Sequence, residues 1–246
     1  MSYPRFFISS DGIEGNTVVL DGESAQHISR SLRMTAGERI VVCDRRKNEY
    51  ECVLESFTSD TVTARIDDVR RSASEPGYEA VVYQACPKSD KMDSIVQKAV
   101  ELGACGIVAF LSDRCIARYD AKGFEKKCQR WQKIAQEAAK QSGRGCIPYV
   151  RWLPDLKSVI EEAKQSEACF MCYEDESAVT LKEYLGQRGE AGSVSFIIGS
   201  EGGFSEKEAD LCRQNGIATV GLGKRILRTE TASGFVLSCL SYEKEL

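Results

Sequence analysis

The sequence contains no apolar run that approaches the roughly 18–20 residues of a membrane-spanning helix. Its first residues, MSYPRFFISSDG, lack the basic start and the long apolar stretch of a secretory signal. We therefore expect neither a membrane segment nor export, and we expect the protein to act in the cytoplasm.

Residues that commonly bind metal ions are also scarce. The chain has a single histidine, His27, and one CxxC pair, Cys169 and Cys172, which lies inside an apolar run. A zinc site would need a second pair of ligands, and a redox pair would normally open a helix. We expect no metal site, and we interpret the 11 cysteines as small buried residues in a reducing compartment. His27 is expected to cap or pack a short helix.

The chain as a whole lacks the positive charge that a nucleic-acid partner would favour, since its net charge is −4. The charge is unevenly distributed, however. Residues 84–151 hold 13 Lys and Arg against 7 Asp and Glu, whereas residues 152–246 hold 10 against 16. Such a local excess either forms a basic surface or only solvates helix faces, and charge alone leaves both interpretations open.

Residues 1–73 have the pattern of a small β-rich domain. Short segments with strand propensity at 17–20, 39–43, 49–57 and 61–69 are separated by turn residues, with one short helix at 24–31. This pattern predicts a small β-barrel. The polar stretch 70–77, RRSASEPG, is the expected linker to a second domain over residues 74–246.

From residue 80 onward, short apolar strands alternate with amphipathic helices. The expected strands are 81–86, 106–111, 168–173, 194–198 and 217–222, and the helices are 89–102, 124–143, 155–164, 181–187, 205–215 and 230 to near the end. Ser89 is expected to cap one helix, and Ser205 with Glu208 forms a capping box at another. This alternation predicts an α/β domain with a mainly parallel sheet, whose ligands bind beyond the carboxyl ends of strands.

Two loops follow strands of that sheet. The first, 199–204, reads Gly-Ser-Glu-Gly-Gly-Phe; it is either a tight strand-to-helix connection or a place where the backbone approaches a ligand closely. It is not a P-loop, because no Gly-Lys-Ser/Thr follows. The second, 222–232, places three cations together with Ile226 and Leu227. Apolar residues in a loop usually pack on a ligand or a partner.

Taken together, these segments resemble the RsmE family of the SPOUT methyltransferases. The resemblance runs in order through almost the whole chain, over residues 4–7, 27–33, 88–103, 131–148, 198–205 and 222–232, and the stretch ILRTETA is its most specific part. The family usually has proline where this chain has Ser200.

The resemblance implies an activity and an architecture. The family transfers methyl groups from S-adenosylmethionine to N3 of a uridine in small-subunit (16S) ribosomal RNA, so the expected partner is this RNA or the small ribosomal subunit. It also implies a carboxyl-terminal trefoil knot that holds the cofactor, a PUA-like N-terminal barrel that assists RNA binding, and a homodimer with each site at the subunit interface. Two alternatives are a SPOUT methyltransferase that acts on transfer RNA and a non-catalytic RNA-binding or ribosome-assembly protein.

The resemblance and the loops together nominate binding residues. The cofactor is expected to contact, largely through backbone groups, Met171, Tyr173, Ile198, Gly199, Glu201, Gly202, Leu222, Gly223, Ile226 and Leu227. The expected contacts to RNA phosphates are Arg5, Arg30, Arg33, Lys88, Lys91, Arg114 and Arg144.

Catalysis must deal with the proton on uridine N3, which makes this atom a poor nucleophile until the proton is lost. A carboxylate, Glu201 or Glu230, could accept that proton. Alternatively a cation, Arg228 or Arg225, could stabilise the charge that develops on the base. Among these candidates we favour Arg228.

Overall fold

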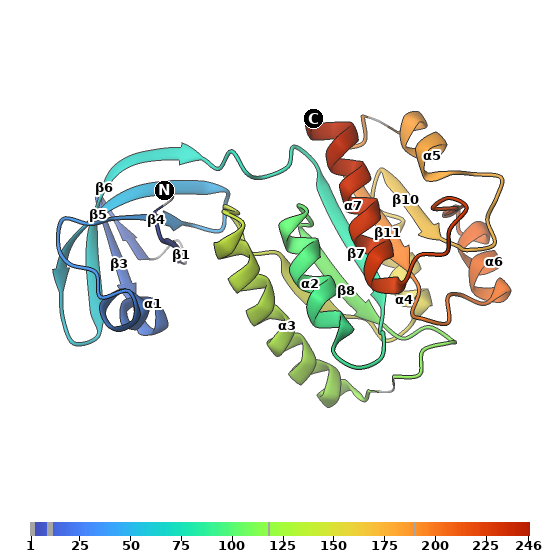
Figure 1. The fold of residues 1–246 in the computed structure, drawn as a ribbon, viewed down its shortest axis with the longest axis horizontal. Helices are drawn as coiled ribbons and strands as arrows, with labels where there is room; N and C mark the ends of the chain where they lie inside the picture. Colours follow the sequence, from blue (N-terminus) through green and yellow to red (C-terminus); the bar gives the residue numbers. More distant parts are fainter. Residues whose placement is uncertain (1–2, 9–11, 118, 189) are drawn as a thin grey trace. The chain divides into compact units, whose positions relative to one another are not determined.

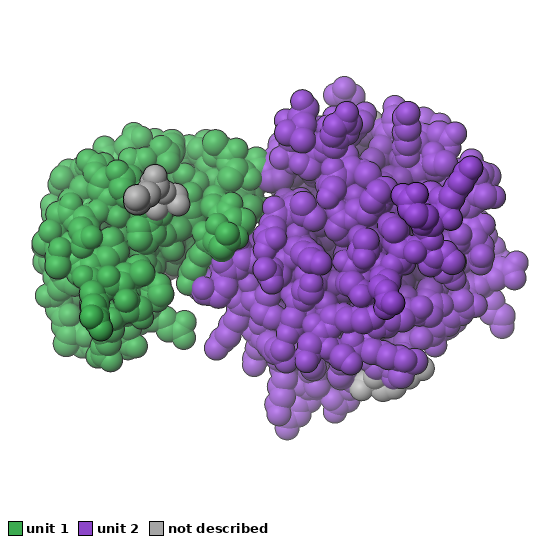
Figure 2. Space-filling model, viewed as in Figure 1, with its two compact units in different colours: residues 1–75, 139–147 green, residues 76–138, 148–246 purple. Residues whose placement is uncertain are grey.

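The computed structural model describes residues 3–8, 12–117, 119–188 and 190–246. The chain divides into two compact units, which Figure 2 shows in different colours. Unit 1 comprises residues 1–75 and 139–147, and unit 2 comprises residues 76–138 and 148–246. No pattern in the sequence indicated that residues 139–147 group with the N-terminal residues instead of the second domain.

Unit 1 is built around one sheet. Its described strands are β1 (Arg5–Phe7), β2 (Ile13–Glu14), β3 (Thr17–Asp21), β4 (Arg39–Cys43), β5 (Asn48–Phe57) and β6 (Thr61–Arg71), and helix α1 (Gly22–Gln26) continues into a π-helical turn at His27–Ser31. The strand order is β1-β4-β5-β6-β3-β2, and only the β1–β4 pair is parallel. The four longer strands confirm those expected from the sequence, whereas closure into a barrel stays a prediction.

Alternating side chains form the core of unit 1. Along β3, Val18 and Leu20 are buried, and along β6 the same holds for Val62 and Ala64. A period of two places these residues on one face of the sheet. They pack in one cluster with Ile28 of the π-helical turn, so the short helical segment covers this face.

Two arginines that were expected to contact RNA, Arg5 and Arg144, form hydrogen bonds with groups inside unit 1. Arg144 is only 3% exposed, and its Nε and Nη2 donate to the two carboxylate oxygens of Glu75 at 2.8 and 2.9 Å. Burial alone would raise the pKa of Glu75, but the hydrogen bonds and charge of Arg144 lower it to about 2. Arg5 Nη1 likewise donates to Glu49 at 2.7 Å and to the Arg144 carbonyl at 3.2 Å. The Arg144 guanidinium is buried in these contacts and is therefore not available for phosphate, which corrects its expected role. The contacts of Arg5 use Nη1, so its role in RNA binding stays a prediction.

Unit 2 is an α/β unit with a parallel sheet, as expected. Its strands are β7 (Glu79–Ala85), β8 (Gly106–Phe110), β9 (Tyr149–Trp152), β10 (Ala168–Cys172), β11 (Ser193–Ile198) and β12 (Ala218–Val220). Its helices are α2 (Lys91–Glu101), α3 (Ala121–Gln141), α4 (Leu156–Ala163), α5 (Leu181–Gln187), α6 (Glu206–Gln214) and α7 (Thr229–Glu245), and the last residues of α3 belong to unit 1. All pairs in the order β12-β10-β11-β7-β8-β9 are parallel.

Sequence periodicity explains how the helices cover this sheet. Every residue of β8 is buried, as expected for a central parallel strand. Helix α2 buries Met92, Ile95, Val96 and Ala99 at helical spacing, and α7 lies against α2 (Figure 1). The expected cap at Ser89 was wrong: α2 is preceded by Asp90, and Ser89 has a positive φ of 57°. Ser89 therefore belongs to the turn before the helix.

The order of the strands predicts where unit 2 binds a ligand. From β7 the chain continues to β8 and β9 on one side, and then crosses to the other side, where it forms β10, β11 and β12. Open parallel sheets bind ligands beyond the carboxyl ends of the strands, at the point where the strand order reverses. Here that point lies where β7 and β11 end. Within the described residues, no helix has the length and apolar character needed to cross a membrane.

Candidate active site

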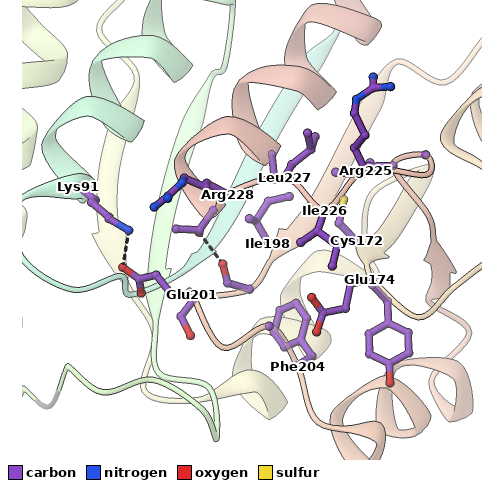
Figure 3. A pocket seen from close by; sticks show the side chains of 18 of the residues that line it. Lys91, Cys172, Glu174, Ile198, Glu201, Phe204, Arg225, Ile226, Leu227 and Arg228 are labelled. Atoms are coloured by element: carbon purple, nitrogen blue, oxygen red, sulfur yellow. Dashed lines mark hydrogen bonds and ion pairs between the residues drawn. The ribbon is translucent and has the colours of Figure 1, made fainter.

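A cavity of about 310 Å³ lies at this carboxyl edge of the unit 2 sheet. Its walls come from the ends of β10 and β11, the loops after β11 and β12, and the start of α7 (Figure 3). The volume falls at the lower end of the range for small-molecule sites, roughly 300–1,000 Å³. The lining residues are Lys91, Cys172, Tyr173, Glu174, Ile198, Gly199, Ser200, Glu201, Gly203, Phe204, Leu222, Gly223, Lys224, Arg225, Ile226, Leu227, Arg228, Thr229 and Ala232.

The glycine loop, residues 199–204, needs its glycines for close packing. A Cβ on Gly199 would lie 3.1 Å from the backbone of Gly203, and Gly203 itself has a φ of +64°. A Cβ on Gly203 would lie 3.0 Å from a carboxylate oxygen of Glu174. The predicted capping box then opens α6, with the Ser205 and Glu208 side chains each accepting from the other's backbone N–H. The loop is thus both a tight connection and one wall of the cavity.

The arginine loop, residues 223–227, has the opposite character. Among the residues that the structure describes, no backbone or side-chain partner accepts from or donates to its backbone groups. Ile226 is 83% exposed, which is unusual for a large apolar side chain that lines a cavity. The loop therefore offers both polar backbone groups and apolar surface to a molecule in the cavity.

A buried glutamine joins the glycine loop to the start of α7. Gln84, at the end of β7, is completely buried, and its Nε2 donates to Gly199 O at 3.2 Å and to Thr229 Oγ1 at 2.9 Å. Thr229 Oγ1 in turn donates to Gly199 O at 2.6 Å. These hydrogen bonds fix the glycine loop against the first residue of α7.

Two carboxylates meet at Lys91 on the rim of the cavity. Lys91 Nζ lies 2.9 Å from Glu201 Oε1 and 3.5 Å from Glu230 Oε2. The Glu201 carboxylate also accepts from the backbone N–H of Lys88. Burial alone would raise the pKa of Glu201, but the hydrogen bonds from Lys91 and Lys88 and the charge of Lys91 hold it below its ordinary value. A carboxylate stabilised in this way is a poor proton acceptor.

The structure brings most of the nominated cofactor residues together. All ten line the cavity except Met171, which is completely buried in β10, and Gly202, whose carbonyl accepts from Arg114 Nη1 at 3.0 Å. Arg114, nominated for RNA, thus supports the glycine loop. Arg228 and Arg225 both line the cavity, whereas Glu230 lies beside it through its contact with Lys91.

The nominated RNA contacts are not brought together as a set. Arg30, Arg33 and Lys88 are exposed, the first two in unit 1 and the third in unit 2. Lys91 is held by its two carboxylates at the rim of the cavity.

Three residues that shape the cavity, Cys172, Glu174 and Phe204, were not among the predicted site residues. Glu174 and Phe204 lie close together in Figure 3, at some distance from Lys91 and Glu201. The position of Glu174, two residues after the end of β10 and beside the glycine loop, could have identified it from the strand order. Cys172 also lines the cavity, and burial raises the pKa of its thiol, so it stays protonated at neutral pH.

Known proteins resemble this chain over almost its whole length. Residues 74–241 match the RNA methyltransferase domain family, and residues 20–67 match the RNA methyltransferase PUA domain. The ribosomal RNA small subunit methyltransferase E of Bacillus subtilis is 34% identical over 95% of this chain and 93% of its own length.

Solved structures agree with this match. A ribosomal RNA small subunit methyltransferase E from Neisseria gonorrhoeae, bound to S-adenosylmethionine, is 29% identical with a TM-score of 0.84, covering 98% of this chain and 97% of its own. A protein from Legionella pneumophila in complex with the same cofactor is 30% identical with a TM-score of 0.86, covering 98% of both chains. The chain therefore belongs to the ribosomal RNA small subunit methyltransferase E family, whose members carry an RNA methyltransferase domain and a PUA domain.

Proposed function

We propose that this protein transfers the methyl group of S-adenosylmethionine to N3 of a uridine in small-subunit (16S) ribosomal RNA, in the cytoplasm. The arginine loop carries the proposal. It lines the cavity together with Arg228, and its backbone groups have no hydrogen-bond partner within the described residues. Relatives of about 30% identity are solved with this cofactor bound, which supports the same ligand here.

The residues present fit S-adenosylmethionine. Ile198, Phe204 and Ile226 supply apolar surface for the adenosine, and the backbone of the arginine loop supplies donors and acceptors for its polar edge. The Glu174 carboxylate suits the positive charge of the ligand. The Oγ of Ser200 lines the cavity, is buried, and has no hydrogen-bond partner within the described residues, so a ligand would satisfy it.

The bound cofactor supplies a methyl group on a positively charged sulfur, so the protein's task is to orient the uridine and favour loss of its N3 proton. Glu201 is unsuited to accept this proton because its pKa is lowered by Lys91 and Lys88. Arg228 has no hydrogen-bond or ion-pair partner for its guanidinium within the described residues. Its charge stabilises the negative charge that develops on the base as the N3 proton leaves.

The activity is tested with small-subunit particles that lack the modification. Methyl transfer from labelled cofactor should yield 3-methyluridine on nucleoside analysis. Methylation of transfer RNA, or of a ribose hydroxyl, would replace this assignment with another RNA substrate. Cofactor binding without transfer to any RNA would instead make the protein a non-catalytic RNA-binding factor.

Gln84 gives a prediction about cofactor binding. Gln84→Leu removes the donor that joins Gly199 and Thr229, so we expect the affinity for S-adenosylmethionine to fall by about tenfold, equivalent to about 1.4 kcal/mol. Calorimetric titration measures this change. Ser195→Ala is the matched control, because Ser195 is a buried polar residue of the adjacent strand β11 that bonds Ser166 instead of the loops. Equal affinities of Gln84→Leu and the wild type would contradict the role.

We also propose the trefoil knot. Gly221, after β12, donates to Val179 O at 2.8 Å and accepts from Leu181 N at 3.0 Å, so the chain there runs tightly beside residues 176–181. It then reaches Thr229, beside Gly199 and Gln84. These contacts interlace three segments distant in sequence. The test is an experimental structure of the chain. A backbone path that became a straight line when its two ends were pulled apart would overturn the knot.

A homodimer is the final part of the proposal. Helix α7 presents Phe235, Cys239 and Tyr242 at helical spacing, with Phe235 38% and Tyr242 73% exposed. The opposite side of α7 is buried in unit 2, so this apolar stripe remains available to a second copy. Light scattering should give twice the chain mass, and Tyr242→Glu should shift it toward one chain mass. A wild-type monomer at micromolar concentration would contradict the dimer.

A further inference from the structure

Four of the cations expected to contact RNA form hydrogen bonds or ion pairs within the protein. Other cations must therefore contribute to binding a polyanionic RNA. Arg5 and Arg144 bond the carboxylates of unit 1, Lys91 bonds Glu201 and Glu230, and Arg114 bonds Gly202. If residues 84–151 form a basic surface, other cationic side chains of this segment must provide its charge.

Helix α3 carries the exposed part of that excess. Lys122, Lys126, Gln129 and Lys133 are exposed and follow one another at steps of four, three and four residues. These steps place them on one face of the helix. Within the described residues, none of the three lysines forms an ion pair. We call this row the α3 stripe.

The opposite face of α3 fixes the orientation of the stripe. Phe124, Trp131 and Ala135 are each 3% exposed or less, so α3 cannot rotate without exposing them. With a rise of 1.5 Å per residue, the 11 steps from Lys122 to Lys133 span about 16 Å. A row of this length can contact several successive phosphates of one strand.

Other residues of α3 connect this helix to the rim of the cavity. Arg130, between two members of the stripe, contacts Asp90 and Asp93 at the start of α2, and Trp131 Nε1 donates to Asp93 Oδ1 at 3.2 Å. Lys91 lies between these two aspartates in sequence, and its Nζ reaches Glu201 in the cavity wall. Figure 1 shows α2 and α3 side by side, as these contacts require. Helix α3, which carries the stripe, is therefore connected to the cavity wall through the start of α2.

We propose that the α3 stripe is a phosphate-binding track for the RNA segment that flanks the target nucleotide. This inference rests on the proposed function, which supplies the RNA. Lysine suits the task because it is a strongly hydrated point charge that contacts phosphates irrespective of base sequence. Gln129 adds a neutral donor for a phosphate or a ribose oxygen. The track positions the RNA strand on the protein, while the cavity and Arg228 contact the target base.

The test compares two triple variants of the full chain with the same change in net charge. The first replaces the stripe with K122Q, K126Q and K133Q. The control carries K157Q, K164Q and K182Q, at exposed lysines on or next to α4 and α5. Affinity for a small-subunit RNA fragment is measured from 50 to 200 mM salt, with cofactor affinity and kinetics of methyl transfer in parallel.

Three lost phosphate contacts should lower the salt slope of the stripe variant by about 2, since each contributes roughly 0.7 on a single strand. Its affinity for RNA should fall at least tenfold at 50 mM salt, and its KM for RNA should rise while kcat and cofactor affinity stay unchanged. The control should match the wild type. Wild-type RNA affinity and salt slope in the stripe variant would overturn the track while leaving the methyltransferase proposal intact.

Two further outcomes also decide the question. If the stripe variant binds naked RNA normally but loses methylation of assembled particles, the stripe contacts an acidic ribosomal protein, and the RNA track is wrong. If the wild-type protein neither binds nor methylates any RNA, the proposed function fails first and the track fails with it.

Discussion

Replacement of Arg228 by alanine is expected to lower the turnover of methyl transfer by about two to three orders of magnitude at saturating cofactor and RNA. This is the usual cost of removing one group that stabilises charge in a transition state. Arg228 is the residue immediately before α7, and its carbonyl accepts from Thr231 N at 2.8 Å and Ala232 N at 2.9 Å. Its backbone is therefore fixed, while its guanidinium has no partner within the described residues.

Arg225 provides a matched control on the same loop. Arg225→Ala removes the same charge, but Figure 3 shows the two side chains pointing in different directions, with Arg228 on the side of Lys91. We expect Arg225→Ala to retain turnover within a fewfold of the wild type, and Arg228→Lys to fall between wild type and alanine because lysine keeps the charge without the planar fork. Single-turnover kinetics at saturating RNA separates the chemical step from binding. Wild-type turnover in Arg228→Ala, with normal RNA binding, would rule out the role.

The largest effect on stability is expected at Gly221. A Cβ added there would lie 2.3 Å from the backbone oxygen of Glu176, a separation that real Cβ atoms do not show. The hydrogen bonds of Gly221 to Val179 and Leu181 prevent an easy shift. We therefore expect Gly221→Ala to destabilise the protein by about 3 kcal/mol, near the upper end for overpacking, which lowers Tm by roughly 6–12 °C. Because the residues on both sides of the contact lead into the cavity, cofactor affinity should fall by more than 100-fold.

Gly186→Ala serves as the control for this change. Gly186 lies in α5 with no atom within 4 Å of an added Cβ, and its φ is ordinary. Alanine in a helix is favoured over glycine by about 1 kcal/mol, so this variant should be slightly more stable than the wild type. Differential scanning calorimetry and calorimetric titration of the cofactor compare the two variants. A Gly221→Ala protein with wild-type Tm and cofactor affinity would show that the close contact is absent.

Local patterns in the sequence predicted the elements that periodicity determines. The apolar runs and amphipathic spacings gave the central strands and the long helices of unit 2, and the Ser205–Glu208 capping box gave the start of α6. The glycines of the first loop and the apolar residues of the second loop predicted that these two loops line a ligand site. These patterns are local, so each helix, strand or loop can be predicted from its own segment of the sequence.

The partner of a charged side chain is not a local property, and here prediction failed. Arg144 looked like a surface cation because nothing near it in sequence indicates that Glu75, 69 positions earlier, would bury it. Lys91 is held by Glu201 and Glu230, far along the chain. Gln84 was assigned only to a strand, although its side chain joins the glycine loop to the start of α7. The short strands β1 and β9 were missed because three or four residues carry too little periodicity.

The inclusion of residues 139–147 in unit 1 has a consequence for the order of folding during synthesis. A chain leaves the ribosome from its N-terminus, and domains usually fold as they emerge. Here the carboxylate of Glu75 acquires the hydrogen bonds of Arg144, Gly145 and Cys146 only after the whole of segment 76–138, which belongs to unit 2, has been made. The N-terminal unit is therefore completed late, and its maturation depends on the growth of the unit encoded after it.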